Sequence, residues 1–163
     1  MAEPPFHIVF FEPEIPQNTG STARLCAATG ATLHLVGKLG FRTDAAAVKR
    51  AGLDYWPHVT VVQHKTWAAF SEHAGPQARL WFFSKRADRI YTTADFAPGD
   101  YLVFGPETRG LPDKIMETAP DRCVRMPIQT HKVRSLNLAT AAGIALFEAL
   151  RQTGYQGIED FLM

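Results

Sequence analysis

Residues 101–112, YLVFGPETRGLP, decide how this chain folds. Tyr101–Phe104 is a short apolar run, as expected for a strand in a sheet that is covered on both faces. Gly105 and Pro106 end this strand, and a polar loop follows at once, before Pro112 at the expected start of a helix. Open α/β sheets bind ligands at loops that leave the carboxyl ends of their strands. The stretch therefore predicts a ligand loop, and the alternative is a tight strand-to-helix turn with surface charges.

Expected strands alternate with expected helices on both sides of this stretch. The strands are expected at residues 6–12, 31–36, 59–63, 80–83, 101–104 and 122–126. The helices are expected at residues 19–28 with Asn18 as N-cap, at 45–51, at 66–73, shortly after Pro112, and through Leu136, Ala139, Gly143, Leu146, Phe147 and Leu150, with Gly154 past the end. The alternation predicts an α/β fold with a mainly parallel sheet flanked by helices.

Length and composition place bounds on the class of protein. A chain of 163 residues with 46% hydrophobic residues suits one globular domain, expected to span residues 1–163. We expect no membrane partner, because no apolar run is long enough to span a bilayer and no cleavable signal begins the sequence. Cys26 and Cys123 have neither metal-site nor redox-motif spacing, which favours a reducing, cytoplasmic location. The net charge of +1 neither requires nor excludes a nucleic-acid partner.

The common cofactor and catalytic motifs are absent from the sequence. It has no G-x-G-x-x-G after the first expected strand, no G-x-x-x-x-G-K-[ST] and no G-x-S-x-G. A Rossmann dehydrogenase, a P-loop NTPase and an α/β-hydrolase are therefore disfavoured. No histidine or cysteine spacing is typical of zinc, and we expect no metal.

Polar segments follow three of the expected strands: residues 13–24 (PEIPQNTGSTAR), 105–112 (GPETRGLP) and 126–137 (MPIQTHKVRSLN). Together with AGLDYW at residues 51–56, these segments resemble the SPOUT superfamily of RNA methyltransferases. The resemblance is closest to its tRNA 2′-O-ribose branch, and within that branch to methyltransferases of the wobble cytidine or uridine. It extends from Phe6 to about Gly154, which is nearly the whole chain.

The resemblance implies S-adenosylmethionine-dependent methylation of the ribose 2′-hydroxyl of the wobble pyrimidine in the tRNA anticodon loop. It also implies a C-terminal trefoil knot, whose loops hold the cofactor, and a homodimer that completes the site. Periodicity alone predicts no knot, since knots are nearly absent among folds. We expect the apolar, glycine-containing face around Gly143 to permit close approach of another backbone, and so to contribute to the dimer.

By resemblance, the cofactor contacts five residues: Phe83, Gly105, Met126, Ile128 and Ser135. Adenine needs apolar walls with backbone donors and acceptors nearby, and loops at strand ends supply both. For the three apolar side chains in this set, ordinary core packing is the alternative.

By resemblance, Arg24 is the main catalytic residue, accompanied by Glu107, Asn18 and Asn137. A guanidinium stays protonated at neutral pH, so we expect Arg24 to stabilise the developing alkoxide and hold a phosphate, although a solvated surface arginine is the alternative. Glu107 orients Arg24 or favours a helix N-terminus, and a cap alone would explain Asn18. Ser135 is expected as N-cap of the last helix, with Asn137 in its first turn.

RNA contacts are expected from basic residues in and around the loops: Arg24, Arg42, Lys49, Arg50, Lys85, Arg86, Arg89, Arg109, His131, Lys132 and Arg134. Trp56, Trp67, Tyr55 and Tyr91 could stack on bases or be structural. Three alternatives to the wobble assignment stay open. They are methylation of another tRNA or rRNA site, a non-catalytic RNA-binding module, and a small-nucleotide binding protein.

Overall fold

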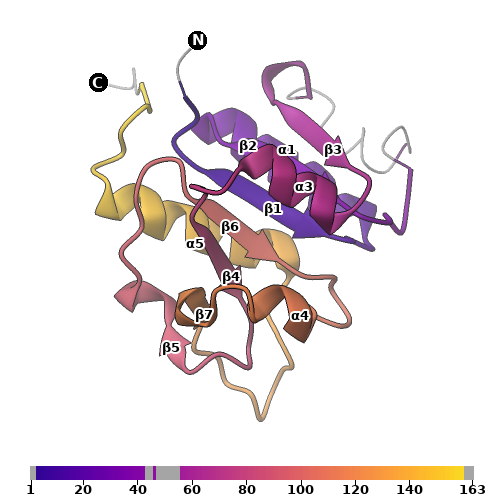
Figure 1. Cartoon of the computed structure of the whole chain (residues 1–163), viewed down its shortest axis with the longest axis vertical. Coiled ribbons are helices and arrows are strands. Elements are labelled where there is room, and N and C mark those ends of the chain that lie inside the picture. Colours follow the sequence, from indigo (N-terminus) through magenta and orange to yellow (C-terminus); the bar gives the residue numbers. More distant parts are fainter. Residues whose placement is uncertain (1–2, 43–45, 47–55, 160–163) are drawn as a thin grey trace.

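The computed structural model describes residues 3–42, 46 and 56–159. Seven strands form one sheet in the order β3-β2-β1-β6-β4-β7-β5, and all paired neighbours are parallel (Figure 1). The strands are β1 (His7–Phe11), β2 (Thr32–Val36), β3 (Val61–His64), β4 (Leu80–Phe83), β5 (Arg89–Ile90), β6 (Tyr101–Phe104) and β7 (Cys123–Arg125). The α/β class with a parallel sheet is therefore confirmed.

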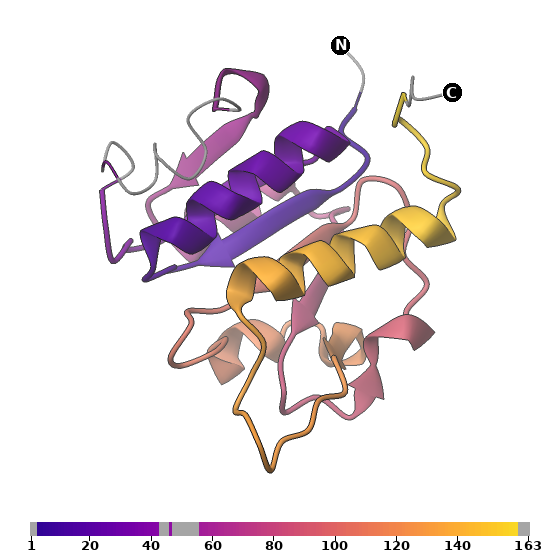
Figure 2. The ribbon, with the colours of Figure 1, turned by 180° about the vertical axis from the view of Figure 1, so that it is seen from behind.

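Helices cover both faces of this sheet. The α-helices are α1 (Pro16–Thr29), α3 (Trp67–Ala74), α4 (Asp113–Met116) and α5 (Leu138–Gln152), and short 3-10 turns lie at Trp56–His58, Tyr91–Thr93 and Pro120–Arg122. Helices α1 and α5 lie side by side on one face, as the rear view shows (Figure 2). Helix α3 lies on the other face (Figure 1). The described part of the chain contains no helix long and apolar enough to cross a membrane.

Successive side chains of each strand point to opposite faces of the sheet and contribute to a separate hydrophobic core on each face. Ile8 and Phe10 of β1 pack with the α1 and α5 side chains, whereas Val9 packs with Phe70 of α3 on the opposite face. This pattern follows from the two-residue period of a strand. The central strand β6 is buried along its whole length, as predicted from its apolar run.

The order of the strands places a topological switch point between β1 and β6. From β1 the chain adds β2 and then β3 toward one edge of the sheet. It then crosses to the opposite half of the same sheet, where β4 lies beyond β6. In open α/β sheets, ligands bind at the carboxyl ends of the strands near such a point. The loops of residues 12–15 and 105–112 both begin at this edge.

Most expected elements are present within a few residues of their predicted ends. Strand β5 was not predicted, because a strand of two residues is too short to show an alternating pattern of apolar and polar residues. The expected helix at residues 45–51 and the AGLDYW segment at 51–56 fall almost wholly outside the described residues.

Two predictions of local structure were wrong. Helix α1 begins at Pro16 with Ile15 as N-cap, so Asn18 lies inside its first turn rather than capping it. Asn137, not Ser135, is the N-cap of α5, and its side chain accepts a hydrogen bond from the Thr140 N–H. Phe147, one of the apolar residues at helical spacing in the last helix, is 47% exposed.

Two glycines of the last helix have different outcomes. Gly154, with φ of +71°, follows the end of α5 as predicted, and the N–H of Tyr155 bonds back to the carbonyl of Leu150 at 2.8 Å. Gly143 lies opposite Leu25 of α1, at 4.0 Å from the position that a Cβ would take. Gly143 therefore faces α1 of its own chain at this point, and its expected use at a dimer contact stays a prediction.

Candidate active site

The carboxylate of Glu107 joins the loop after β6 to the start of α1. Its two oxygens accept hydrogen bonds from the backbone N–H groups of Glu14 (2.7 Å) and Ile15 (2.8 Å), and from the side-chain amide of Asn18 (3.0 Å). Helix α1 has no side-chain cap from its own N-cap residue. Glu107 thus supplies from a distant loop the negative charge and the acceptors that a helix N-terminus favours.

Asn18 extends this connection to the start of α5. Its Oδ1 accepts a hydrogen bond from the Nδ2 of Asn137 at 2.9 Å, while Asn137 caps α5 with its other amide atom. Glu107, Asn18 and Asn137 therefore form one hydrogen-bonded chain, which we call the carboxamide chain. It links all three polar segments singled out in the sequence.

Glu14 and Thr108 also join the loop after β6 to the segment before α1, and here the carboxylate belongs to the segment before α1. The carboxylate of Glu14 accepts hydrogen bonds from the N–H of Thr108 (2.9 Å) and from its hydroxyl (2.8 Å). These bonds favour the charged form and hold the pKa of Glu14 below its usual value. Glu14 and Thr108 were not among the predicted site residues, although both lie in the quoted motifs.

Gly105 allows the loop after β6 to fold back on itself. A Cβ at this position would lie 2.3 Å from the carbonyl carbon of Gly110 and 2.3 Å from the backbone nitrogen of Leu111. Both contacts are with backbone, which cannot move aside without moving the loop. Glycine is therefore required here for close approach.

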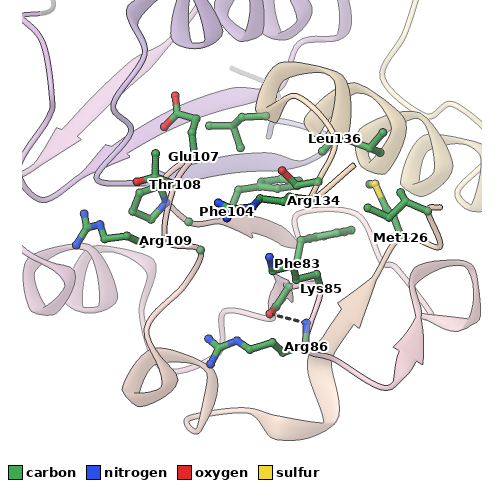
Figure 3. A pocket seen from close by; sticks show the side chains of 18 residues that line it. Phe83, Lys85, Arg86, Phe104, Glu107, Thr108, Arg109, Met126, Arg134 and Leu136 are labelled. Atoms are coloured by element: carbon green, nitrogen blue, oxygen red, sulfur yellow. Dashed lines mark hydrogen bonds between the residues drawn. The ribbon is translucent and has the colours of Figure 1, made fainter. Parts of the chain in front are cut away.

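A cavity of about 230 Å³ opens beside this loop (Figure 3). It is built from the segments after β4, β6 and β7 and from the start of α5. Its lining residues are Phe83, Ser84, Lys85, Arg86, Phe104, Gly105, Pro106, Glu107, Thr108, Arg109, Gly110, Met126, Ile128, Arg134, Ser135, Leu136, Leu138 and Ala141.

The cavity combines an apolar wall with a basic rim. The rings of Phe83 and Phe104 stack with centroids 4.7 Å apart, and Met126 lies across from Arg109 in the close-up (Figure 3). Lys85, Arg109 and Arg134 are exposed at the rim. An apolar slot with polar loop atoms and positive charge at its mouth suits a flat heteroaromatic group attached to anionic or polar parts.

Arg86 also lies at the rim but is held in place. Its guanidinium donates to Asp113 at 2.6 Å and to the carbonyl of Leu111 at 2.8 Å. It thereby fastens the segment after β4 to the end of the loop after β6. Arg86 fixes the shape of the rim.

The five residues predicted to contact a cofactor all line this one cavity. Their contact with a cofactor stays a prediction. Of the predicted catalytic set, Glu107 lines the cavity, and Asn18 and Asn137 stand behind it in the carboxamide chain. Arg24 is exposed on α1 and is not among the lining residues of its own chain.

The residues predicted to contact RNA have three outcomes: they are exposed, they are packed or bonded within the chain, or they lie outside the described residues. Those exposed in the described structure are Arg24, Arg42, Lys85, Arg86, Arg109, His131, Lys132 and Arg134. Arg89 instead donates to the carbonyls of Thr93 and Asp121, and Trp67 packs on Phe70, so both have structural roles. Tyr91 packs against the core, while Lys49, Arg50, Tyr55 and the side chain of Trp56 lie outside the described residues.

Comparisons with known proteins give the family. Residues 5–147 match the SpoU rRNA Methylase family, and the chain belongs to that family. A relative from Saccharophagus degradans, named tRNA (cytidine(34)-2′-O)-methyltransferase, is 47% identical over 153 residues. The alignment covers 93% of this chain and 98% of the relative.

Solved structures agree with the sequence relatives. A structure described as giving insights into the 2-OH methylation of C/U34 on tRNA superposes with a TM-score of 0.87 and 47% identity. That match covers 91% of this chain and 96% of the other. An AdoMet-bound rRNA methyltransferase from Sinorhizobium meliloti matches with a TM-score of 0.81 at 26% identity, over 92% of this chain and 57% of its own.

Replacement of Glu107 by alanine tests the junction. We expect a loss of about 2–4 kcal/mol in the free energy of unfolding, because three donors lose their acceptor and the α1 N-terminus loses its charge. Glu72→Ala is the matched control, since Glu72 is an exposed residue of α3, and it should change stability by less than about 0.5 kcal/mol. Urea unfolding of both variants gives the comparison, and equal stabilities would contradict the role of Glu107.

Proposed function

We propose that this protein transfers a methyl group from S-adenosylmethionine to the ribose 2′-hydroxyl of the wobble pyrimidine nucleotide in the tRNA anticodon loop. The observation that carries the proposal is the cavity at the carboxyl ends of β4, β6 and β7, whose walls come from the second and third motif segments and to which the carboxamide chain joins the first. The 47% identical relative named for this activity at cytidine 34, matched along nearly its whole length, supports the choice of nucleotide.

The residues present fit S-adenosylmethionine. Stacked Phe83 and Phe104, with Met126 and Ile128, offer apolar surface for adenine, and the backbone of Gly105 lines the same cavity. Ser135 adds a hydroxyl at the same cavity. When bound, the cofactor supplies an electrophilic methyl group on a positively charged sulfur. We propose Phe83, Gly105, Met126, Ile128 and Ser135 as its contacts.

The anionic substrate would meet the basic rim. Lys85, Arg109 and Arg134 stand exposed where a ribose-phosphate backbone would pass the cavity mouth. Phosphate contacts of this kind supply affinity and register without reading sequence. A single-stranded anticodon loop suits a small protein of this kind, because its nucleotides can be turned out of the stack.

Transfer would form a bond between the ribose 2′-oxygen and the methyl carbon while the bond from that carbon to the cofactor sulfur breaks, and the 2′-hydroxyl proton would pass to solvent water. We propose that Arg24 stabilises the developing alkoxide and holds the adjacent phosphate, since its charge and forked geometry suit both tasks. Glu107 and Asn18 contribute by position, because their polar atoms are committed to the carboxamide chain. Asn137 sets the start of α5 beside the cavity.

The position of Arg24 supports a homodimer. Within one chain Arg24 does not line the cavity, so a second copy is needed to bring an Arg24 to it. Ile15, Ile144 and Phe147 are large apolar side chains that remain 42%, 38% and 47% exposed at the outer side of α1 and α5. We propose that this surface, with Gly143 one turn before Phe147, forms the dimer contact.

Three further features belong to the same proposal. The chain forms one domain across residues 1–163, and the segments around β6, β7 and α5 form a trefoil knot, as the family resemblance implies. The enzyme acts in the cytoplasm. Burial raises the pKa of the Cys26 thiol to about 12 and also raises that of Cys123, which suits structural, reduced cysteines.

Methyl transfer to total tRNA from cells that lack wobble 2′-O-methylation tests the function. We expect one 2′-O-methylated pyrimidine, mapped to position 34 by nucleoside and fragment mass spectrometry. Methylation at another tRNA position or in rRNA would retain the chemistry and refute the site. Absence of both methylation and cofactor binding would favour the non-catalytic alternative.

Arg24→Ala tests the assigned catalytic residue. We expect turnover to fall at least 100-fold, while the cofactor dissociation constant stays within about threefold, because Arg24 acts on the substrate oxygen. Arg151→Ala is the control, since Arg151 is also exposed but lies at the far end of α5 from the cavity. Near-normal turnover by Arg24→Ala would remove this residue from the mechanism.

Phe147→Lys tests the dimer surface. A charge in the apolar contact should shift the protein toward monomers in analytical ultracentrifugation and lower activity in parallel. Glu72→Lys, on the other side of the sheet, should leave both unchanged. A wild-type protein that is monomeric and fully active would contradict the dimer proposal.

A further inference from the structure

Four histidines gather on the face of the sheet that α3 covers. His7, His34 and His64 come from the adjacent strands β1, β2 and β3, and His73 comes from the last turn of α3. His34 and His64 are only 1% and 8% exposed. Polar side chains are costly to bury without partners, so their clustering needs an explanation.

Direct contacts join the first three rings in a row. His7 Nδ1 lies 2.9 Å from His34 Nε2, and His34 Nδ1 lies 3.0 Å from His64 Nε2. A neutral imidazole has one N–H and one acceptor nitrogen. His34 can therefore donate to only one of its two neighbours, and its other nitrogen has a lone pair to offer.

His73 completes a potential ligand set with two of these rings. One nitrogen from each of His34, His64 and His73 lies within 4.8 Å of the other two. Imidazole ligands at about 2.0–2.1 Å from a tetrahedral ion are roughly 3.3 Å apart, so the pair at 3.0 Å is already close to that spacing. His73 is exposed at the surface, which gives its side chain room to close the remaining distance.

We propose that His34, His64 and His73 bind one divalent transition-metal ion, with Zn²⁺ as the occupant. His34 Nδ1 and His64 Nε2 are the inner ligands, and His73 binds from the solvent side. Three imidazoles suit zinc, and water takes the fourth position where the site opens beside His73.

The surroundings match those of a protein metal site. His7 Nδ1 is placed to accept a hydrogen bond from His34 Nε2–H, which would leave Nδ1 of His34 as the ligand atom. Phe70 packs edge-on against both His34 and His64, and Tyr101 stacks on His7 with centroids 4.0 Å apart.

The site has a structural role separate from the methyltransferase cavity. The three ligands belong to β2, the edge strand β3 and helix α3, so the ion would fasten the edge of the sheet to its covering helix. None of the three lines the cavity at the carboxyl ends of β4 and β6. The ion would therefore stabilise the fold without entering the transfer reaction. This proposal replaces the expectation of no metal, which rested on linear spacing.

The test uses the full-length protein without a polyhistidine tag, stripped with a chelator and titrated with Zn²⁺ against a chromophoric competitor at pH 7. We expect one ion per chain, with a dissociation constant of about 1 µM or tighter. At free Zn²⁺ of 100 times that constant, the unfolding midpoint should rise by about 5–10 °C. Co²⁺ in place of Zn²⁺ should give the visible absorption of a four-coordinate site.

Two variants locate the ion. His73→Ala removes an exposed ligand and should fold normally, but bind Zn²⁺ at least tenfold more weakly and lose the midpoint shift. His58→Ala, which removes another exposed histidine, should behave as the wild type. Absence of tight binding by the wild type, or equal binding by His73→Ala, would overturn the proposal and leave a histidine hydrogen-bond row alone.

Discussion

The Glu107 carboxylate is the constraint on which the active-site end of the molecule depends. It accepts three hydrogen bonds at the start of α1, from two backbone N–H groups and one side-chain amide. Loss of such an acceptor leaves half-buried donors unpaired at the positive end of a helix. The free-energy cost of an unpaired donor is larger than the net stabilisation from one hydrogen bond. Glu107 therefore fixes the loop after β6 against α1.

This attachment explains how segments far apart in sequence form one cavity. Asn18 connects Glu107 to Asn137, and Asn137 caps α5. The loop from β6, the start of α1 and the start of α5 thus move together. Gly105 lets the loop turn back tightly beside this junction, so the apolar wall and the basic rim face the same space.

Much of this arrangement is readable from the sequence, and the remainder has physical reasons for being hidden. Apolar runs and helical spacing locate the strands and long helices, and the motif segments locate the cavity. The sequence pattern could not show that Asn18 lies inside α1 instead of capping it. The acceptor at the start of this helix is the carboxylate of Glu107, which is distant in the sequence. The exposure of Phe147 could not be read from the sequence, because an exposed apolar residue at helical spacing has the same pattern as a buried one.

The histidine cluster was hidden for a different reason. His34 and His64 stand 30 residues apart and meet only because β2 and β3 are neighbours in register. Strand pairing of this kind depends on the whole topology and not on local spacing. The position of Arg24 outside the lining of the cavity was hidden for the same reason.

A double-mutant cycle on Asn18 and Asn137 tests most directly whether the carboxamide chain holds the cavity in shape. Calorimetry would give the affinity for S-adenosylmethionine of the wild type, Asn18→Ala, Asn137→Ala and the double variant. A coupling energy of about 0.5–1 kcal/mol is the predicted result, because the two residues share one hydrogen bond and either loss loosens the same junction. Additive losses, within about 0.3 kcal/mol, would contradict the account.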